Sequence, residues 1–200
     1  MLIDKFNPLT NANCNNSLLL QEILPELQSN SQMIETPQLL IKPLNYEQLL
    51  KYIRNDNSLE KELNLSVTFR EIPPELTEAL EQTILPAVAD NTRNYLYSTL
   101  WTIILKDQDK MIGDLCFVGE PNESGEVEIG YGTYKAFQGK GYMTEAVGGM
   151  IRWALEQPEI KAIVASTDKT NTASYSVLIK NGFIKSGENQ DLFHWRLQLR

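Results

Sequence analysis

The sequence predicts one mixed α/β domain with a mostly antiparallel central sheet flanked by helices. Three observations predict it. Strand-like segments separated by short polar turns fill the middle of the chain. A long segment with helical spacing of apolar residues begins at residue 142, and a continuous apolar strand and a second helix follow it. The length of 200 residues suits about one domain with a buried core, and 42% hydrophobic with 22% charged residues is typical of a globular protein.

In the first half, the pattern predicts helices followed by an antiparallel meander. Residues 38–44 have the composition of a strand, and residues 45–55 that of a helix capped by Asn45. Two prolines at 73–74 mark the start of another helix, because proline is favoured in a first helical turn. Three strand candidates rich in aromatic and β-branched residues follow, at 95–105, 111–119 and 126–134.

In the second half, helical and strand patterns alternate. Residues 142–157 carry apolar side chains at helical spacing and stop before Pro158. Residues 160–167 form a continuous apolar run, which predicts a strand covered on both faces. Residues 171–182 predict a helix that ends on Asn-Gly. Residues 193–199 alternate strictly and predict a strand with one apolar face.

Residues 1–30 differ from the rest, and we treat them as an N-terminal extension that is partly helical, with the domain over 31–200. The extension has an Asn-rich start and a short amphipathic stripe, which suits either a helix folded onto the domain or an arm for interaction or dimerisation. It lacks a basic-then-apolar signal pattern, and no apolar run approaches the roughly 18 residues of a membrane span. We therefore expect no membrane association.

The net charge and the numbers of cysteine and histidine residues argue against several classes of function. The net charge of −8 argues against nucleic acid as the main ligand, because phosphate contacts need clustered Lys and Arg, and it mildly favours a cationic substrate. Two cysteines are too few for a disulfide framework and suit a reducing cytoplasm. One histidine and two cysteines make a His/Cys zinc site unfavourable, so we expect no metal.

The stretch FQGKGYMTEA at 137–146 predicts an anion site. A strand leads into a glycine-rich loop, and a helix starts at once. The first turn of a helix leaves N–H groups unpaired, and Gly139 and Gly141 would let a phosphate approach them. A P-loop would need glycine where Tyr134 stands, and a dinucleotide fingerprint would need glycine at Lys135. A plain turn before a helix is the simpler alternative.

This loop resembles the acyl-CoA loop of the GNAT acetyltransferase superfamily, on the run Gln138-Gly139-Lys140-Gly141-Tyr142. Met143 departs from that pattern, which has Gly or Ala there. Three longer segments resemble the subgroup that includes ribosomal-protein N-terminal alanine acetyltransferases: EVEIGYGTYKAFQGKGYMTEAV, NTASYSVLIKNGF and IETPQLLIKPL. The resemblance runs from about residue 34 to the C-terminus and leaves residues 1–30 uncovered.

The resemblance implies a GNAT-like fold and transfer of an acetyl group from acetyl-CoA to a primary amine, either a protein N-terminus or a small cationic amine. We expect a monomer or a homodimer. A non-catalytic acyl-CoA-binding sensor is the alternative, because Met143 departs and Leu178 replaces a tyrosine common among relatives. The cofactor contacts that it implies are Tyr131, Gly132, Thr133, Gln138, Gly139, Lys140, Gly141, Tyr142, Met143, Asn171 and Ser174.

The catalytic residues that the resemblance implies are Glu128 and Ser174. An amine is protonated at neutral pH, so a base is useful, and Glu128 is either that base or an exposed strand residue. Ser174 either contacts the cofactor or donates a proton to the departing sulfur. His194 is expected on the surface or at a cleft edge rather than in catalysis, and Cys116 is expected to be a core thiol rather than a nucleophile.

Overall fold

The computed structural model describes residues 32–200, so the expected helical extension over residues 1–30 lies outside the described part. Along the chain the elements are β1 (Ile34–Glu35), β2 (Leu39–Pro43), α2 (Tyr46–Arg54), α3 (Ser58–Glu62), α4 (Pro74–Ala79), the π-helical turn η1 (Leu80–Ile84), α5 (Leu85–Ala89), the 3-10 turn η2 (Tyr95–Tyr97), β3 (Trp101–Leu105), β4 (Lys110–Phe117), β5 (Glu126–Thr133), the 3-10 turn η3 (Lys135–Phe137), α6 (Tyr142–Glu156), β6 (Ala162–Asp168), α7 (Thr172–Lys180), β7 (Ile184–Glu188) and β8 (Leu192–Gln198).

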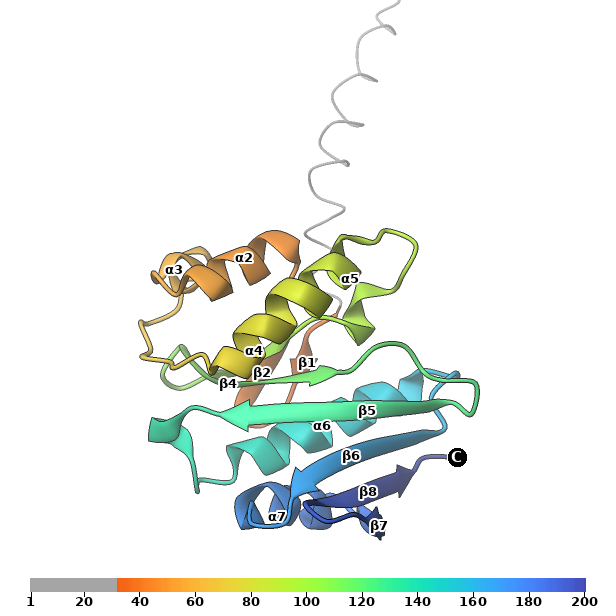
Figure 1. Ribbon diagram of the computed structural model, residues 1–200. Helices are drawn as coiled ribbons and strands as arrows, with labels where there is room; N and C mark the ends of the chain where they lie inside the picture. Colours follow the sequence, from red (N-terminus) through yellow and green to blue (C-terminus); the bar gives the residue numbers. More distant parts are fainter. Residues whose placement is uncertain (1–31) are drawn as a thin grey trace, which may run out of the picture. The chain divides into compact units, whose positions relative to one another are not determined.

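The strands form one eight-stranded sheet in the order β1-β2-β3-β4-β5-β6-β8-β7 (Figure 1). Every neighbouring pair is antiparallel except β5 and β6, which run parallel. This arrangement confirms the predicted fold class, a mixed and mostly antiparallel sheet flanked by helices. Among the described residues, no helix is long and apolar enough to cross a membrane.

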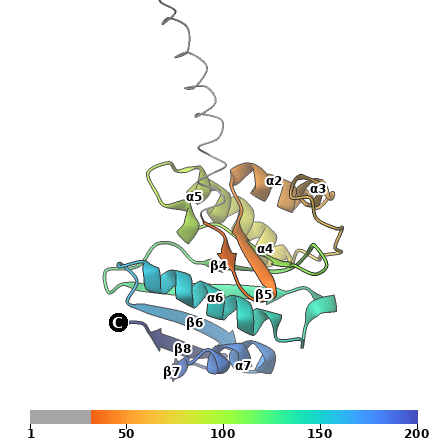
Figure 2. The same cartoon turned by 180° about the vertical axis from the view of Figure 1, so that it is seen from behind.

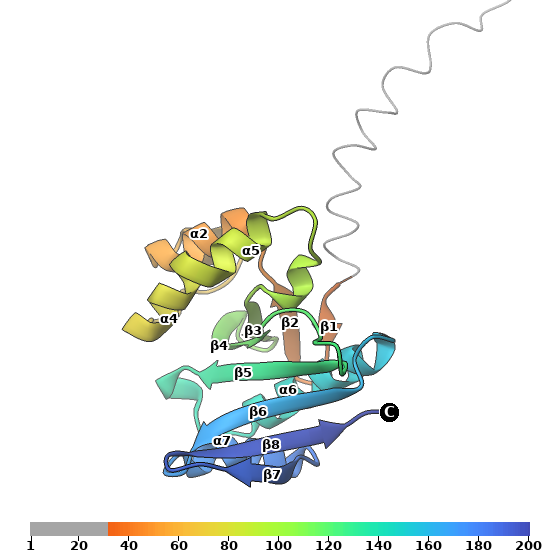
Figure 3. The same cartoon turned by 45° about the vertical axis from the view of Figure 1, so that its right-hand side comes forward.

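The helices cover the two faces of the sheet unequally. Seen from behind in Figure 2, α6 and α7 lie across one face, and the larger core cluster lies under them. On the other face, α2, α4 and α5 gather beside β2, β3 and β4, where a second core cluster is buried (Figure 3). In Figure 1 no helix lies in front of β5, β6 and β8, and Glu128 and Ser166 are exposed on this open face.

Two sequence predictions are wrong in part, each for a tertiary reason. Residues 95–105 were expected to be one strand, but its first residues form η2 because the Asn94 side chain accepts from the Leu96 N–H at 3.2 Å. The indole of Trp101 also donates to the Leu96 carbonyl at 3.0 Å, which holds this turn against β3. The strand at 160–167 was expected to be covered on both faces, yet Ser166 is exposed, because the helices cover only one face there.

Other predictions are confirmed, and some elements carry no clear sequence signal. The helix after Asn45 has a full capping box, in which Asn45 and Gln48 bond each other's backbone N–H. The predicted helices at 142–157 and 171–182 correspond to α6 and α7. The elements β1 and α3 were not predicted because they are too short to show a periodic pattern, and β7 was not predicted because its sequence IKSGE has no alternation of apolar residues.

Candidate active site

The sheet opens between its two parallel strands. Pairing of β5 with β6 ends at Glu128 and Val164, and beyond this pair the strands diverge (Figure 1). We call this opening the split. On its other edge β5 stays paired with β4: the Val118 N–H donates to the Glu128 carbonyl and the Tyr134 N–H donates to the Ile112 carbonyl, both at 2.9 Å.

The backbone of β5 therefore offers hydrogen-bonding groups to the split. Peptide groups of successive residues in an antiparallel strand point alternately to opposite sides. Because the groups of Glu128 and Tyr134 point toward β4, those of Ile129, Tyr131 and Thr133 point toward the split. The groups of Gly132 point toward β4, and the space where its side chain would lie is open.

The glycine-rich loop closes the end of the split and leads into α6. Gly139 and Gly141 adopt φ of 74° and 84°, a region that favours glycine, and both face open space. The Gln138 side chain donates to the Thr133 carbonyl at 3.1 Å and so ties the loop to the end of β5. No side chain caps the first turn of α6, which leaves its N–H groups available to an anion.

Met143 does not obstruct this helix start. Met143 as a whole is 7% exposed and packs in the core under α6, so its buried side chain lies away from the loop. Tyr142 is partly buried, and Lys140 is exposed with its ammonium 5.4 Å from the centre of the Phe137 ring. The departure from Gly or Ala at position 143 therefore leaves the loop open.

Two contacts hold the first turns of α6 against β1 and β2. The Glu145 carboxylate accepts from the Thr36 hydroxyl at 2.6 Å and from the Gln38 N–H at 2.8 Å. One turn later, a Cβ added at Gly149 would lie 3.0 Å from Thr36 Cγ2 and 3.1 Å from Ile41 Cδ1, so glycine lets the helix approach closely without displacing these side chains. These contacts fix where the N-terminus of α6 points.

The structure brings Tyr131 and Ser174 together on the helix-covered side of the split. The Tyr131 hydroxyl donates to the Ser174 carbonyl at 2.9 Å, and the Ser174 hydroxyl donates to the Tyr131 oxygen at 3.2 Å. Asn171 caps α7, its side-chain oxygen accepting from the Ser174 N–H at 3.0 Å. Burial raises the pKa of Tyr131, so its phenol keeps its proton at neutral pH. These bonds link β5 to the first turn of α7.

The open face carries the other predicted residues. Glu128 is exposed at the point where the split begins. Cys116 is partly buried beside it, and burial, with Asp114 and Glu128 nearby, raises the pKa of the Cys116 thiol to about 11. A thiol with this pKa is protonated at neutral pH, which supports a packing role. His194 lies on the same open face, with its Nδ1 3.2 Å from the Ser166 hydroxyl oxygen.

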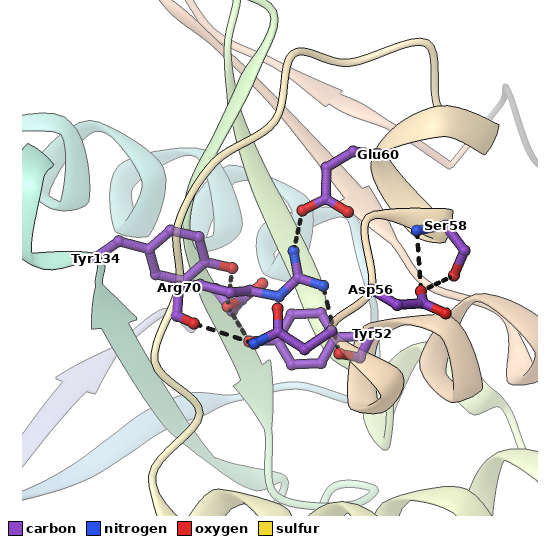
Figure 4. Close-up of polar contacts among 8 residues, drawn as sticks. Tyr52, Asp56, Ser58, Glu60, Arg70 and Tyr134 are labelled. Atoms are coloured by element: carbon purple, nitrogen blue, oxygen red, sulfur yellow. Dashed lines mark hydrogen bonds and ion pairs between the residues drawn. The ribbon is translucent and has the colours of Figure 1, made fainter.

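Sequence reasoning missed a buried polar cluster between the sheet and α2 (Figure 4). Asp114 in β4 accepts from the Tyr52 hydroxyl at 2.7 Å and from the Tyr134 hydroxyl at 2.9 Å. Burial raises the pKa of Asp114, although both hydroxyl bonds act in the opposite direction. A lone aspartate inside the apolar run 111–119 was the signal that could have revealed the cluster.

An ion pair extends the cluster into the segment after α3. Arg70 and Glu60 form an ion pair whose side chains are 0% and 1% exposed (Figure 4). The Arg70 guanidinium also stacks 4.7 Å from the centre of the Tyr52 ring and donates to the Tyr52 carbonyl at 3.3 Å. The cluster thus joins α2, α3 and the segment before α4 to the strand that borders β5.

The split, the uncapped helix start and the glycine-rich loop all lie within the residues that match one family model. Residues 38–184 match the model described as an acetyltransferase (GNAT) domain. The chain belongs to the GNAT acetyltransferase family. This confirms the predicted family. Within residues 32–200, no group of three or more His, Cys, Asp or Glu side chains could hold a metal ion.

Curated relatives match over part of their length. The uncharacterized N-acetyltransferase YjdG of Bacillus subtilis strain 168 is 37% identical over 95 residues, which are 48% of this chain and 56% of that protein. The uncharacterized N-acetyltransferase p20 of Bacillus licheniformis is 33% identical over 91 residues, which are 46% of this chain and 51% of that protein. The chain spans about half the length of these curated relatives.

Solved structures share the fold at low sequence identity. RimL, a ribosomal L7/L12 alpha-N-protein acetyltransferase solved with coenzyme A, superposes with a TM-score of 0.61 and 18% identity, covering 84% of this chain and 98% of that one. A ribosomal-protein-S5-alanine acetyltransferase from Vibrio fischeri gives a TM-score of 0.61 and 20% identity, covering 83% and 96%. These neighbours include the subgroup that the sequence motifs resemble.

Proposed function

We propose that this GNAT protein transfers an acetyl group from acetyl-CoA to a primary amine. The observation that carries the proposal is the uncapped N-terminus of α6, opened by Gly139 and Gly141 at the end of the split. Free N–H groups and the positive end of a helix favour a phosphate there. GNAT neighbours solved with coenzyme A, such as RimL, support the same ligand class.

In this proposal the chain binds the cofactor mainly through its backbone. The pyrophosphate meets the N–H groups at the start of α6, with Gln138 holding the loop in place. The pantetheine arm lies along the split, where the peptide groups of Tyr131 and the N–H of Thr133 point and can pair with its amides. Ser174 and Asn171 border the same arm from α7.

Glu128 is proposed as the group that accepts a proton from the acceptor ammonium. It stands where the split begins, on the open face from which an acceptor can approach. The free amine then attacks the thioester carbonyl carbon, its nitrogen gives up the remaining excess proton, the carbon–sulfur bond breaks, and the sulfur leaves with the electron pair. A thiol with a pKa near 8.5 leaves with little help, so a proton donor to sulfur is not required. We therefore assign Ser174 to cofactor positioning.

The acceptor class follows from charge and from the family neighbours. The net charge of −8 favours a cationic acceptor. An α-amine, whose pKa in short peptides is about 7.7–8.0, loses its proton far more easily than a lysine side chain at about 10.4. RimL is named as an alpha-N-protein acetyltransferase. A protein N-terminus is therefore the first acceptor that we propose, and a small cationic amine is the second; we expect the protein to act in the cytoplasm.

A matched pair of loop variants tests cofactor binding. Gly141→Asp and Gly141→Asn have side chains of nearly equal size, and both residue types tolerate a positive φ, so they differ mainly in charge. We expect Asp to weaken acetyl-CoA binding at least tenfold relative to Asn, about 1.4 kcal/mol, in isothermal calorimetry. Equal affinity of the two folded variants would refute the phosphate-binding assignment.

Transfer itself is tested by thiol release. Purified protein with acetyl-CoA is offered a panel of small amines and short peptides with free N-termini, and released CoA is measured. We expect release with at least one peptide. Tight acetyl-CoA binding without release on any acceptor would favour the sensor alternative over the enzyme.

A further inference from the structure

A serine–histidine pair flanks the split on the side opposite β5. In the register of β6 and β8, Ser166 lies directly beside His194, and the Ser166 hydroxyl oxygen is 3.2 Å from Nδ1 of His194. This is the only hydrogen bond that either side chain makes among the described residues. His194 is also the single histidine of the sequence.

The sheet register places this pair close to Glu128. Glu128 pairs with Val164, and Ser166 follows Val164 by two residues, so both Glu128 and Ser166 point to the same open face. Regular strand spacing of about 4.8 Å and a rise of about 3.3 Å per residue would put their α-carbons roughly 8 Å apart, and the divergence of the strands makes the separation somewhat larger. A reacting group that emerges from the split would therefore lie between the Glu128 carboxylate and the Ser166 hydroxyl.

The surroundings leave the pair accessible. On the β7 side, His194 is opposite Gly187, where an added Cβ would be 3.8 Å from the imidazole, so no side chain covers the ring there. Ser166 is exposed and His194 is partly exposed. An acceptor can thus reach both residues from solvent.

Few charged groups face this pair. Arg196 in β8 lies on the same face and is ion-paired with Glu126 in β5, so its charge is largely balanced. Asp168 is the last residue of β6 and lies on this face. Its carboxylate accepts a hydrogen bond from the Thr170 N–H at 2.7 Å. Glu128 lies across the split, and β7 presents Gly187. The Ser166 hydroxyl is thus the polar group that contacts the imidazole of His194.

We propose that Ser166 and His194 form a second proton-accepting unit for the acceptor amine, on the β6 side of the split. The inference rests on the proposed function. Ser166 is the group that contacts the amine, and His194 is the base that acts through it.

The proton balance of the reaction leaves a role for a second acceptor beside Glu128. An ammonium loses two protons on its way to a secondary amide, and Glu128 can accept only one of them in a turnover. As the nitrogen bonds to the carbonyl carbon, its remaining excess proton passes to the Ser166 oxygen while the Ser166 hydrogen moves to Nδ1 of His194. The carbon–sulfur bond then breaks and the thiolate leaves with its electron pair. His194 returns its proton to solvent.

The first test compares three variants: His194→Gln, Ser166→Ala and, as a matched control, Ser186→Ala on exposed β7. The rate of acetylation of a short peptide with a free α-amine is measured from pH 5.5 to 9 at saturating acetyl-CoA, and acetyl-CoA affinity is measured by calorimetry. We expect His194→Gln to lower kcat/KM roughly 10²-fold at pH 7, with less loss at pH 9, and Ser166→Ala about tenfold. Acetyl-CoA affinity stays within about twofold in all three variants, and Ser186→Ala matches wild type. Wild-type kcat/KM and pH profile in folded His194→Gln would overturn the proposal.

The second test does not depend on turnover. Because His194 is the single histidine, its imidazole proton and carbon signals in NMR are assigned without ambiguity. We expect acetyl-CoA to shift these signals and Ser166→Ala to change their titration curve. Signals unchanged by saturating acetyl-CoA would place His194 away from the reacting group and refute the proposal. If wild-type protein acetylates no amine while the signals do shift, the proposed transfer fails and the placement of His194 beside the cofactor stands.

Discussion

Breaking the buried Arg70–Glu60 pair should destabilise the domain far more than breaking an exposed pair of the same kind. In Arg70→Met the Glu60 carboxylate, 1% exposed, loses its cation. Its second oxygen and the Arg70 Nε have no hydrogen-bond partner among the described residues, so no spare group can replace the guanidinium. Removing one partner of a buried ion pair leaves an uncompensated charge.

The size of the effect follows from the burial. Loss of one member of a buried pair costs about 3–5 kcal/mol. In a domain of this size, each kcal/mol lowers Tm by about 2–4 °C, so we expect Tm to fall by roughly 6–20 °C. The control is Lys51→Met, which breaks the Lys51–Glu62 pair, whose side chains are 31% and 34% exposed. Such partly exposed pairs contribute less than about 1 kcal/mol, so its Tm should fall by less than about 4 °C.

Thermal unfolding followed by circular dichroism measures both variants at several pH values. In Arg70→Met the unpaired, buried carboxyl favours its neutral form, so the folded state binds a proton more readily than the unfolded state. The fall in Tm of Arg70→Met relative to wild type should therefore be largest at pH 7 and become smaller toward pH 5. The double variant Glu60→Leu/Arg70→Met removes both charges and should recover most of the stability. Equal losses in Arg70→Met and Lys51→Met would refute the reasoning.

Three further predictions concern the sheet and the split. Burial raises the pKa of Asp114, so ionisation of its side chain lowers the free energy of unfolding as pH rises above about 3.9. The stability of Asp114→Asn relative to wild type, measured by urea titration, should therefore increase from pH 4 to pH 7, and an equal difference at pH 4 and pH 7 would contradict this. Ser174→Ala should lower acetyl-CoA affinity by about 0.5–1.5 kcal/mol with little change in kcat, because the Ser174 hydroxyl hydrogen is held by Tyr131; a large loss of kcat at unchanged affinity would instead make Ser174 a proton donor. Glu128→Gln should reduce kcat/KM roughly 10²-fold at pH 7 and less at pH 9, and a pH–rate profile identical to wild type would leave Glu128 as an exposed strand residue.

Much of the candidate cofactor site could be predicted from sequence, because the residues involved are close together in the chain. The loop at 137–146 and the start of α6 are contiguous, and glycine spacing reports the backbone that they need. Asn171 and Ser174 lie in one helical turn, where the cap and its partner are three residues apart. The backbone geometry of the loop and of the helix cap depends on residues that are neighbours in the chain, so the sequence can predict it.

The buried polar cluster and the Ser166–His194 pair depend on contacts between residues far apart in the chain. Asp114, Tyr52 and Arg70 come from a strand, a helix and a connecting segment, and no spacing in the sequence reveals that they share one buried cluster. The pairing of Ser166 with His194 likewise follows from the register of β6 against β8. Register depends on which faces the helices bury, and that is decided by packing of the whole domain.

The sequence by itself determined the fold class, the order of the long elements and the position of the glycine-rich loop before α6, since periodicity, turn residues and glycine positions act over a few residues. Tertiary structure alone decided that β5 and β6 part after Glu128, that one face of β6 stays open, and that a lone histidine stands beside the split. The physical reason is that strand divergence and face coverage arise from side-chain packing between elements up to about a hundred residues apart, such as Glu145 against Thr36, which no local pattern encodes.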